Sequence, residues 1–144
     1  GETMRQTISF VTLGVADLER SRRFYQALGW QESSASQAAV AFFQAGSVAF
    51  ALFGRDALAE DAGVPSSGHG FPSFTLAHNV AGEAEVDATL TEAVAAGGRL
   101  VLAGKRAPWG GFRGYFADPD GFLWEVCHNP FIPLDEQGFV RLPE

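Results

Sequence analysis

Few side chains in this sequence have the chemistry for proton transfer, nucleophilic attack or metal binding. The three histidines are scattered: His69 lies between two glycines, His78 precedes a predicted helix, and His128 follows a predicted strand. His69 could supply a metal ligand only if the strand after it extended back to include it, and we interpret it as a loop residue. None of the histidines is therefore assigned a catalytic role.

A carboxylate and a thiol lie in an apolar run that predicts a strand, Phe122–Cys127. Because side chains alternate along a strand, Leu123, Glu125 and Cys127 share one face. A lone buried cysteine behaves more often as a small apolar side chain than as a nucleophile. Glu125 is therefore the candidate acid, base or polar anchor, since it is the carboxylate on this face that could exchange a proton with a ligand or accept its hydrogen bond.

The segment Trp109–Tyr115 combines three glycines with three aromatic residues, which is unusual inside a strand. It is equally consistent with a bulged hairpin whose Trp109 and Tyr115 side chains form the rim of a pocket, and with a bulge that has no role in binding. Arg106 and Arg113 are close by in sequence. Either of them could reach Glu125, although exposure to solvent is the default for both.

The elements that must position these residues begin with an alternating, β-branched segment followed by a helix. Asp17 is a residue type that caps helix N-termini, and Gly29 ends the helix at its C-terminal side. Two apolar segments then predict strands joined by a turn at Ala45-Gly46-Ser47, whereas residues 31–38 are polar and weakly patterned. The first half therefore predicts a strand, a helix and two or three strands: strand 8–15, helix 18–28, and strands 40–43 and 48–53.

The second half repeats this order after a loop rich in glycine, proline and serine at residues 61–70. A helix with an apolar stripe ends at Gly97-Gly98, and Asp118-Pro119-Asp120-Gly121 has the composition of a type I turn between two strands. The stripe consists of Val86, Leu90, Ala93 and Val94. The predicted strands are 71–77, 99–102, 114–117 and 122–127.

The repeated order predicts an α+β fold made of two tandem βαβββ modules. We place the first module at residues 4–60, the linker at 61–70, the second module at 71–130 and a C-terminal arm at 131–144, all within a single domain. The two sheets would form one concave mixed surface with the helices outside. Alternation places a mostly apolar set of side chains on the concave face: Ile8, Phe10, Thr12, Ala49, Ala51, Phe53, Phe71, Ser73, Thr75, Leu123, Glu125 and Cys127.

Composition and charge exclude several classes of partner. The chain has 144 residues, close to the usual size of one domain, and a formal net charge of -7. An acidic chain is unsuited to nucleic acid and to anionic membrane surfaces, and no apolar run approaches the ~20 residues that span a bilayer. The single cysteine cannot form an internal disulfide, which favours a cytoplasmic location.

Two stretches resemble the vicinal oxygen chelate superfamily, which contains glyoxalases, bleomycin-resistance proteins and extradiol dioxygenases. The first is Val11–Leu18 with Phe24-Tyr25 and Leu28-Gly29, and the second is Phe116–Val126. The similarity covers nearly the whole chain, from residue 8 to residue 130. It implies paired βαβββ modules around a central cavity, often in a homodimer, and leaves open whether modules pair within the chain or across the dimer.

In the metal-dependent members of that superfamily, four residues on the first and fourth strands of the two modules hold one divalent cation, which acts as a Lewis acid or binds oxygen. The matching positions in this sequence are Phe10, Ala51, Phe71 and Glu125. Only Glu125 has a donor atom of the kind that such a metal uses. We therefore expect no metal cofactor.

We expect a metal-independent protein, similar to the members of this superfamily, that binds a small organic ligand in an apolar cavity with Glu125 as its polar group. Whether it also catalyses a reaction stays open. The alternatives are a metal-dependent lyase or dioxygenase of the same superfamily and a non-catalytic protein that acts through protein contacts. The residues expected to contact the ligand are Phe10, Thr12, Ala51, Phe53, Phe71, Ser73, Trp109, Tyr115, Leu123 and Cys127.

Overall fold

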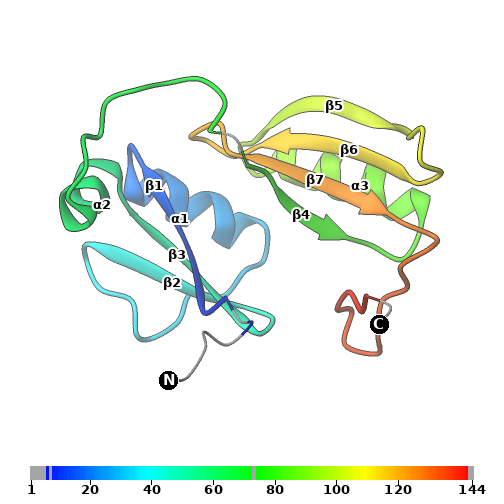
Figure 1. Ribbon diagram of the computed structural model, residues 1–144, viewed down its shortest axis with the longest axis horizontal. Coiled ribbons are helices and arrows are strands. Elements are labelled where there is room, and N and C mark those ends of the chain that lie inside the picture. Colours follow the sequence, from blue (N-terminus) through cyan, green and yellow to red (C-terminus); the bar gives the residue numbers. More distant parts are fainter. Residues whose placement is uncertain (1–5, 7, 73, 143–144) are drawn as a thin grey trace. The chain divides into compact units, whose positions relative to one another are not determined.

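The computed structural model describes residues 6, 8–72 and 74–142. The chain has an α+β fold with two mixed sheets, and it divides into two compact units, residues 1–67 and 68–144 (Figure 1). Each unit consists of one sheet and the helices packed on it, so the two are described separately. Within the described residues, no helix is long and apolar enough to cross a membrane.

The first unit contains, in chain order, β1 (Phe10–Val15), α1 (Leu18–Ala27), β2 (Val40–Ala45), β3 (Val48–Gly54) and α2 (Arg55–Ala62). Its sheet has the order β1-β3-β2. β1 and β3 are parallel, which requires a crossover connection, and the chain makes that crossover through α1. β2 and β3 form an antiparallel pair joined at Gly46, whose φ of 67° suits a tight turn.

α1 begins and ends where the sequence predicts. The Asp17 carboxylate accepts a backbone N–H from the first turn and satisfies a donor that the helix itself leaves free. Gly29 follows the last turn with a φ of 90°, a conformation that glycine adopts without strain. Phe24 and Tyr25 are buried, and the centroid of the Tyr25 ring lies 4.9 Å from that of Phe50 in β3. Aromatic packing thus fixes α1 on one face of the first sheet.

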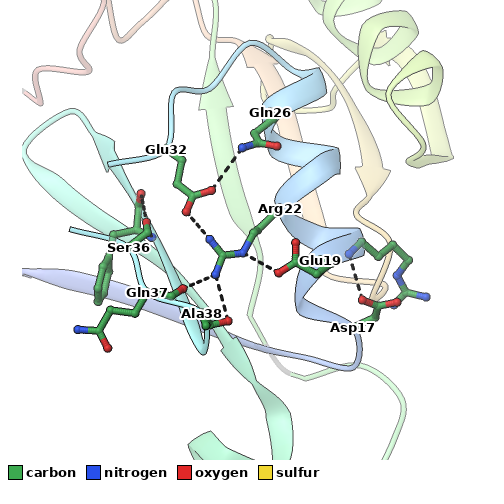
Figure 2. A network of polar contacts seen from close by, with 10 residues as sticks. Asp17, Glu19, Arg22, Gln26, Glu32, Ser36, Gln37 and Ala38 are labelled. Atoms are coloured by element: carbon green, nitrogen blue, oxygen red, sulfur yellow. Dashed lines mark hydrogen bonds and ion pairs between the residues drawn. The ribbon is translucent and has the colours of Figure 1, made fainter. Parts of the chain in front are cut away.

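Residues 31–38 stand where a further strand would follow α1, and they form only isolated bridges to β2. Arg22 of α1 holds this segment in place, as Figure 2 shows. Its guanidinium pairs with Glu32 and donates to the backbone carbonyls of Gln37 and Ala38. The first unit therefore has two strands after its helix, the lower number of the two predicted from the sequence.

The sequence predicts no element at residues 55–60 and a linker from residue 61, whereas the structure forms α2 there. This helix has no side-chain cap at its start and no buried residue, so neither a capping signal nor an apolar stripe marks it. Gly63, with a φ of 73°, ends it. A Cβ added at Gly14 of β1 would lie 3.2 Å from the Cα atom of Arg55, so α2 packs closely on the sheet face opposite α1.

The second unit contains, in chain order, β4 (Leu76–Asn79), α3 (Glu83–Ala95), β5 (Arg99–Arg106), β6 (Phe112–Ala117) and β7 (Leu123–His128). Its sheet has the order β4-β7-β6-β5. β4 is parallel to β7, and the other neighbours are antiparallel. The first three strands of this order, β4-β7-β6, match β1-β3-β2 of the first unit, so the repeat in the sequence corresponds to a repeat in topology.

β4 is shorter than the strand predicted at residues 71–77 and lies further along the chain. It pairs with β7 only over Leu76–Asn79, because β7 begins at Leu123 and the residues before it form a turn. The ring of Phe74 lies 6.0 Å from that of Phe122, at the point where the partner strand ends. Phe71 lies outside the sheet, which corrects its expected place on the first strand of the module.

α3 covers one face of the second sheet. Val86, Leu90 and Ala93 are buried, as the predicted stripe requires, whereas Val94 is exposed and does not belong to it. β6 approaches α3 at Gly114, where an added Cβ would lie 2.6 Å from Cδ1 of Leu90. α3 is the only helix among the described residues of this unit, so no helix of this unit lies on the other face of the sheet.

The turn between β6 and β7 is the one that the sequence predicts. The Gly121 N–H donates to the Asp118 carbonyl at 2.9 Å. Asp118 is buried, and its Oδ1 atom accepts the backbone N–H groups of Asp120 and Phe122 at 3.0 and 2.9 Å. These bonds fix the register in which β7 leaves the turn, and therefore the face on which Glu125 lies.

Candidate functional site

Side chains of β6 and β7 alternate between the α3 side and the helix-free side of the second sheet. Gly114 faces α3, so Arg113 and Tyr115 face away from it. Their cross-strand partners on β7 are Cys127 and Glu125, respectively. We call the side chains that gather on this helix-free face the β6–β7 cluster: Arg113, Tyr115, Glu125 and Cys127.

Tyr115 and Glu125 form the polar pair of the cluster. The Tyr115 hydroxyl donates a hydrogen bond to Oε2 of Glu125 at 3.3 Å, and both side chains are half-buried. Burial raises the pKa of Tyr115, and the neighbouring carboxylate raises it further, while Arg113 acts in the opposite direction. The hydroxyl therefore stays protonated at neutral pH and acts as the donor to Glu125.

Cys127 is buried, and its pKa is raised above the usual value, first by burial and then by the charge of Glu125. Arg113 lowers this pKa without reversing the direction. A thiol with a raised pKa carries little thiolate near neutral pH, and the thiolate is the nucleophilic form. This agrees with the interpretation of Cys127 as a small buried side chain.

Arg113 is half-buried, and its Nη1 atom is buried without a hydrogen-bond partner in the part of the chain that the structure describes. Across the sheet, Lys105 of β5 is in register with it on the same face and is exposed. Arg106 instead lies on the α3 side, where its guanidinium is 3.9 Å from the Glu83 carboxylate. Of the two arginines considered as partners for Glu125, only Arg113 shares its face.

Four of the predicted contact residues share one face of the first sheet: Phe10, Thr12, Ala51 and Phe53. The register with β3 places Thr12 beside Ala51, on the face opposite α1. Phe10 is 56% exposed, and its ring packs edge-on against Phe42 with the centroids 6.0 Å apart. Phe10 and Thr12 are exposed on this face, whereas Ala51 is buried, and α2 packs on the same face at Gly14.

The remaining predicted contact residues are dispersed. Phe71 precedes β4 and is 65% exposed, and Ser73 lies outside the described residues. Trp109 is exposed in the connection between β5 and β6, and its ring lies against Gly111, where an added Cβ would be 2.0 Å from the indole. Three predicted contact residues lie on the helix-free face of the second sheet: Tyr115 in β6, and Leu123 and the buried Cys127 in β7.

The register of the second sheet also brings to the helix-free face three polar residues that the sequence analysis does not place in the site: Arg99, Lys105 and Asn79. Asn79 of β4 is the Cα partner of Cys127. Arg113, which the sequence analysis considers as a partner for Glu125, lies on the face of Tyr115, as strand alternation requires. Lys105 carried no such signal, because irregularities in the pairing of β5 with β6 shift its alternation.

The sheet registers also correct one of the expected metal-binding positions. In the first sheet, Phe10 lies two residues before the strand partner of Ala51. In the second sheet, the residue two before the strand partner of Glu125 is Thr75. Thr75 and not Phe71 is therefore equivalent to Phe10.

The corrected set does not fit a site for a transition metal. It offers the Glu125 carboxylate and a threonine hydroxyl, while Phe10 and Ala51 have no donor atoms. Such metals prefer imidazole, thiolate and carboxylate ligands. Across residues 6, 8–72 and 74–142, no three His, Cys, Asp or Glu side chains gather into a group that could hold a metal ion. The donor chemistry therefore disagrees with the cation that the resemblance implies for metal-dependent members.

Comparisons with known proteins find similarity over nearly the whole chain. Residues 7–126 match the model of the family described as Glyoxalase/Bleomycin resistance protein/Dioxygenase superfamily. A glyoxalase-related enzyme from Fulvimarina pelagi is 38% identical, with a TM-score of 0.88 over 97% of this chain and 100% of that one. A glyoxalase/bleomycin resistance protein/dioxygenase from Nocardioides is 27% identical, with a TM-score of 0.72 over 99% and 93% of the two chains. Lactoylglutathione lyase from Agrobacterium tumefaciens is 25% identical, with a TM-score of 0.64 over 88% and 96%. No curated protein matches the chain.

Proposed function

Because the chain belongs to the Glyoxalase/Bleomycin resistance protein/Dioxygenase superfamily, we propose that it binds a small organic molecule without a metal cofactor, and that the β6–β7 cluster holds the polar end of that molecule. The observation that carries this proposal is the hydrogen bond between Tyr115 and Glu125 on a helix-free sheet face. Small-molecule sites are mostly apolar and contain a few placed polar groups that fix the orientation of the ligand. Leu123 supplies apolar surface beside this polar pair, and Cys127 lies buried next to it.

Glu125 is the proposed anchor for the ligand. Its Oε2 atom accepts the hydrogen bond from Tyr115, and its Oε1 atom has no protein partner within the described residues. Oε1 is therefore free to accept an O–H or N–H group of a ligand. Tyr115 acts as a positioning residue, because its hydrogen bond restricts the rotation of the carboxylate.

Metal independence is supported by the donor set, in which Phe10 and Ala51 replace metal ligands. A lyase or dioxygenase reaction that needs a bound cation is for this reason not part of the proposal. Apolar contacts from Phe10, Thr12, Ala51, Phe53, Phe71, Ser73 and Trp109 stay predictions from the sequence. The homodimer and the cytoplasmic location also stay predictions from the sequence.

Ligand-observed NMR with a library of small fragments tests the proposal. Glu125→Gln keeps the shape of the side chain and removes its charge, so fragments with an O–H or N–H donor should bind about tenfold more weakly or worse, the equivalent of one hydrogen bond to a charged group. Glu60→Gln, at an exposed carboxylate on α2, is the matched control and should bind like the wild type. Tyr115→Phe should give a smaller loss.

Two results would show that the proposal is wrong. The first is a wild-type protein that binds no fragment of the library. The second is a Glu125→Gln variant that binds the same fragments with unchanged affinity between pH 5 and pH 8.

A further inference from the structure

Arg113 belongs to the β6–β7 cluster, but the proposed function gives it no role of its own. It extends from β6 on the helix-free face, and its Nη1 atom is buried without a hydrogen-bond partner among the described residues. Buried polar atoms in folded proteins nearly always have a partner, and an unpaired donor on a charged group is especially unfavourable. The described residues therefore leave this donor available for an acceptor that they do not supply.

None of the described residues around Arg113 forms an ion pair with it. On the same face, β5 contributes Lys105 and, at its start, Arg99. β7 contributes Glu125, while β4 contributes only the uncharged Ala77 and Asn79. Glu125 is engaged by the Tyr115 hydroxyl, and the ion pairs within the described residues do not include Arg113. Three cations and one carboxylate thus make this face locally positive, in a chain whose formal net charge is -7.

We propose that the ligand of this protein is an organic acid and that Arg113 binds its carboxylate. The inference rests on the proposed function and deepens it by naming the chemical class of the ligand. The planar guanidinium presents a fork of N–H donors that matches the two oxygens of a carboxylate. A ligand carboxylate would give the buried Nη1 atom the acceptor that it lacks.

The spacing along β6 adds a second requirement for the ligand. Tyr115 lies two residues after Arg113, so the two Cα atoms are about 7 Å apart along the strand. Glu125 is the cross-strand partner of Tyr115, so it is the diagonal neighbour of Arg113 on the adjacent strand. An acid with an O–H or N–H group at the far end of a short spacer satisfies both positions, with its carboxylate at Arg113 and its donor at Glu125.

Lys105 has a different role in this arrangement. It is the only lysine in the sequence, and it is exposed on the edge strand opposite Arg113. An exposed ammonium group attracts an anion over a distance and is screened by salt. Lys105→Gln should therefore weaken acid binding slightly at low salt and have no effect at high salt.

Matched fragments that differ only in charge test the inference: benzoate, phenylacetate and 4-hydroxybenzoate, each with its carboxamide. NMR titrations follow the fragments and the Nε–Hε signal of Arg113. Each acid should bind the wild type about tenfold more tightly than its amide, as expected for a charge-assisted hydrogen bond. 4-Hydroxybenzoate should bind more tightly than benzoate, because its hydroxyl group can reach Glu125.

Three variants of the arginines assign the effect to one side chain. Arg113→Gln should abolish the preference for acids over their amides, and Arg113→Lys should give an intermediate preference because it keeps the charge and loses the fork. Arg106→Gln is the matched control, because Arg106 lies on the α3 side and pairs with Glu83. It should keep the full preference.

The outcomes separate this inference from the proposed function. Equal binding of acids and amides by the wild type, hits confined to neutral fragments, or an undiminished preference in Arg113→Gln overturns the inference and leaves the proposed function standing. If no fragment of any kind binds, the proposed function is wrong and the inference falls with it. If Arg113→Gln does not fold, the wild-type signal decides: acids should shift the Nε–Hε signal of Arg113 and amides should not, and equal shifts overturn the inference.

Discussion

Replacement of Gly114 by alanine should destabilise the second unit, because β6 has no room for a methyl group at this position. An added Cβ would lie 2.6 Å from Cδ1 of Leu90, 2.6 Å from the carbonyl oxygen of Leu102 and 3.0 Å from the backbone nitrogen of Gly104. Carbon atoms that are not bonded pack at about 3.5–4.0 Å, so the methyl group would overlap its neighbours by roughly 1 Å. The Leu90 side chain can rotate away, but the other two atoms belong to the β5 backbone and cannot move without opening the β5–β6 ladder.

We expect Gly114→Ala to lower the free energy of unfolding by about 2 kcal/mol, within the usual range for an overpacked site. For a chain of this size, that corresponds to a fall in melting temperature of about 6–10 °C, which calorimetry or circular dichroism measures. Gly104→Ala is the matched control: the three atoms nearest to its Cβ, from Asp87 and Phe112, all belong to side chains that can turn away. It should lose less than half as much stability. A wild-type melting temperature for Gly114→Ala, or equal losses for the two variants, would refute the steric argument.

The metal content, the thiol and the assembly of the protein give three more predictions. Elemental analysis after dialysis against Zn²⁺, Ni²⁺, Mn²⁺ or Fe²⁺ should find well under one ion per chain, since Phe10 and Ala51 have no donor atoms; near-unit occupancy that Glu125→Gln removes would contradict this. Iodoacetamide should alkylate Cys127 slowly at pH 7 and faster at higher pH, because its raised pKa leaves little thiolate at neutrality; rapid alkylation of the folded protein at pH 7 would argue against a protected thiol. Light scattering at low micromolar concentration should give twice the 15.4 kDa mass of the chain, since exposed apolar side chains such as Phe10 and Phe131 offer surface for an interface above roughly 1,200 Å². A result of 15.4 kDa alone would exclude the dimer.

Structure that depends on neighbouring residues could be predicted from the sequence. Asp17 and Gly29 mark the ends of α1, and both predictions are confirmed. The Asp118–Gly121 turn is likewise confirmed by its backbone hydrogen bond. A helix cap or a tight turn is decided by side-chain chemistry and backbone freedom within a few positions, so the information lies in the segment itself.

Structure that depends on distant partners could not be predicted in the same way. Residues 71–77 alternate like a strand, but of these only Leu76 and Ala77 pair with β7, because β7 begins at Leu123. The strand that forms is Leu76–Asn79. Because the predicted strand begins too early, the sequence aligns Phe71 with Phe10, whereas the register of the sheet gives Thr75 as the equivalent of Phe10. α2 lacked a cap and an apolar stripe, and its packing against β1 at Gly14 becomes visible only in the folded chain.

The candidate site also combines features that a local pattern predicts with features that depend on distant partners. Alternation correctly predicts that Leu123, Glu125 and Cys127 share a face, since a strand has a fixed period of two. The Tyr115–Glu125 hydrogen bond required the pairing of β6 with β7, which no local pattern specifies. The unpaired Nη1 atom of Arg113 is a property of the surroundings and leaves no mark on the sequence.

The segment at residues 31–38, held by Arg22, protects the first sheet from association with other chains. β2 lies at the edge of that sheet, and an edge strand with free backbone groups is a template for pairing with a strand of another molecule. At Phe42 both outward groups are occupied: its N–H donates to the Ser36 hydroxyl at 2.8 Å, and its carbonyl accepts the Ser33 N–H at 2.7 Å. The polar loop that replaces a strand thus covers one of the two edges of this sheet, and the guanidinium that holds the loop against the helix helps to keep that edge covered.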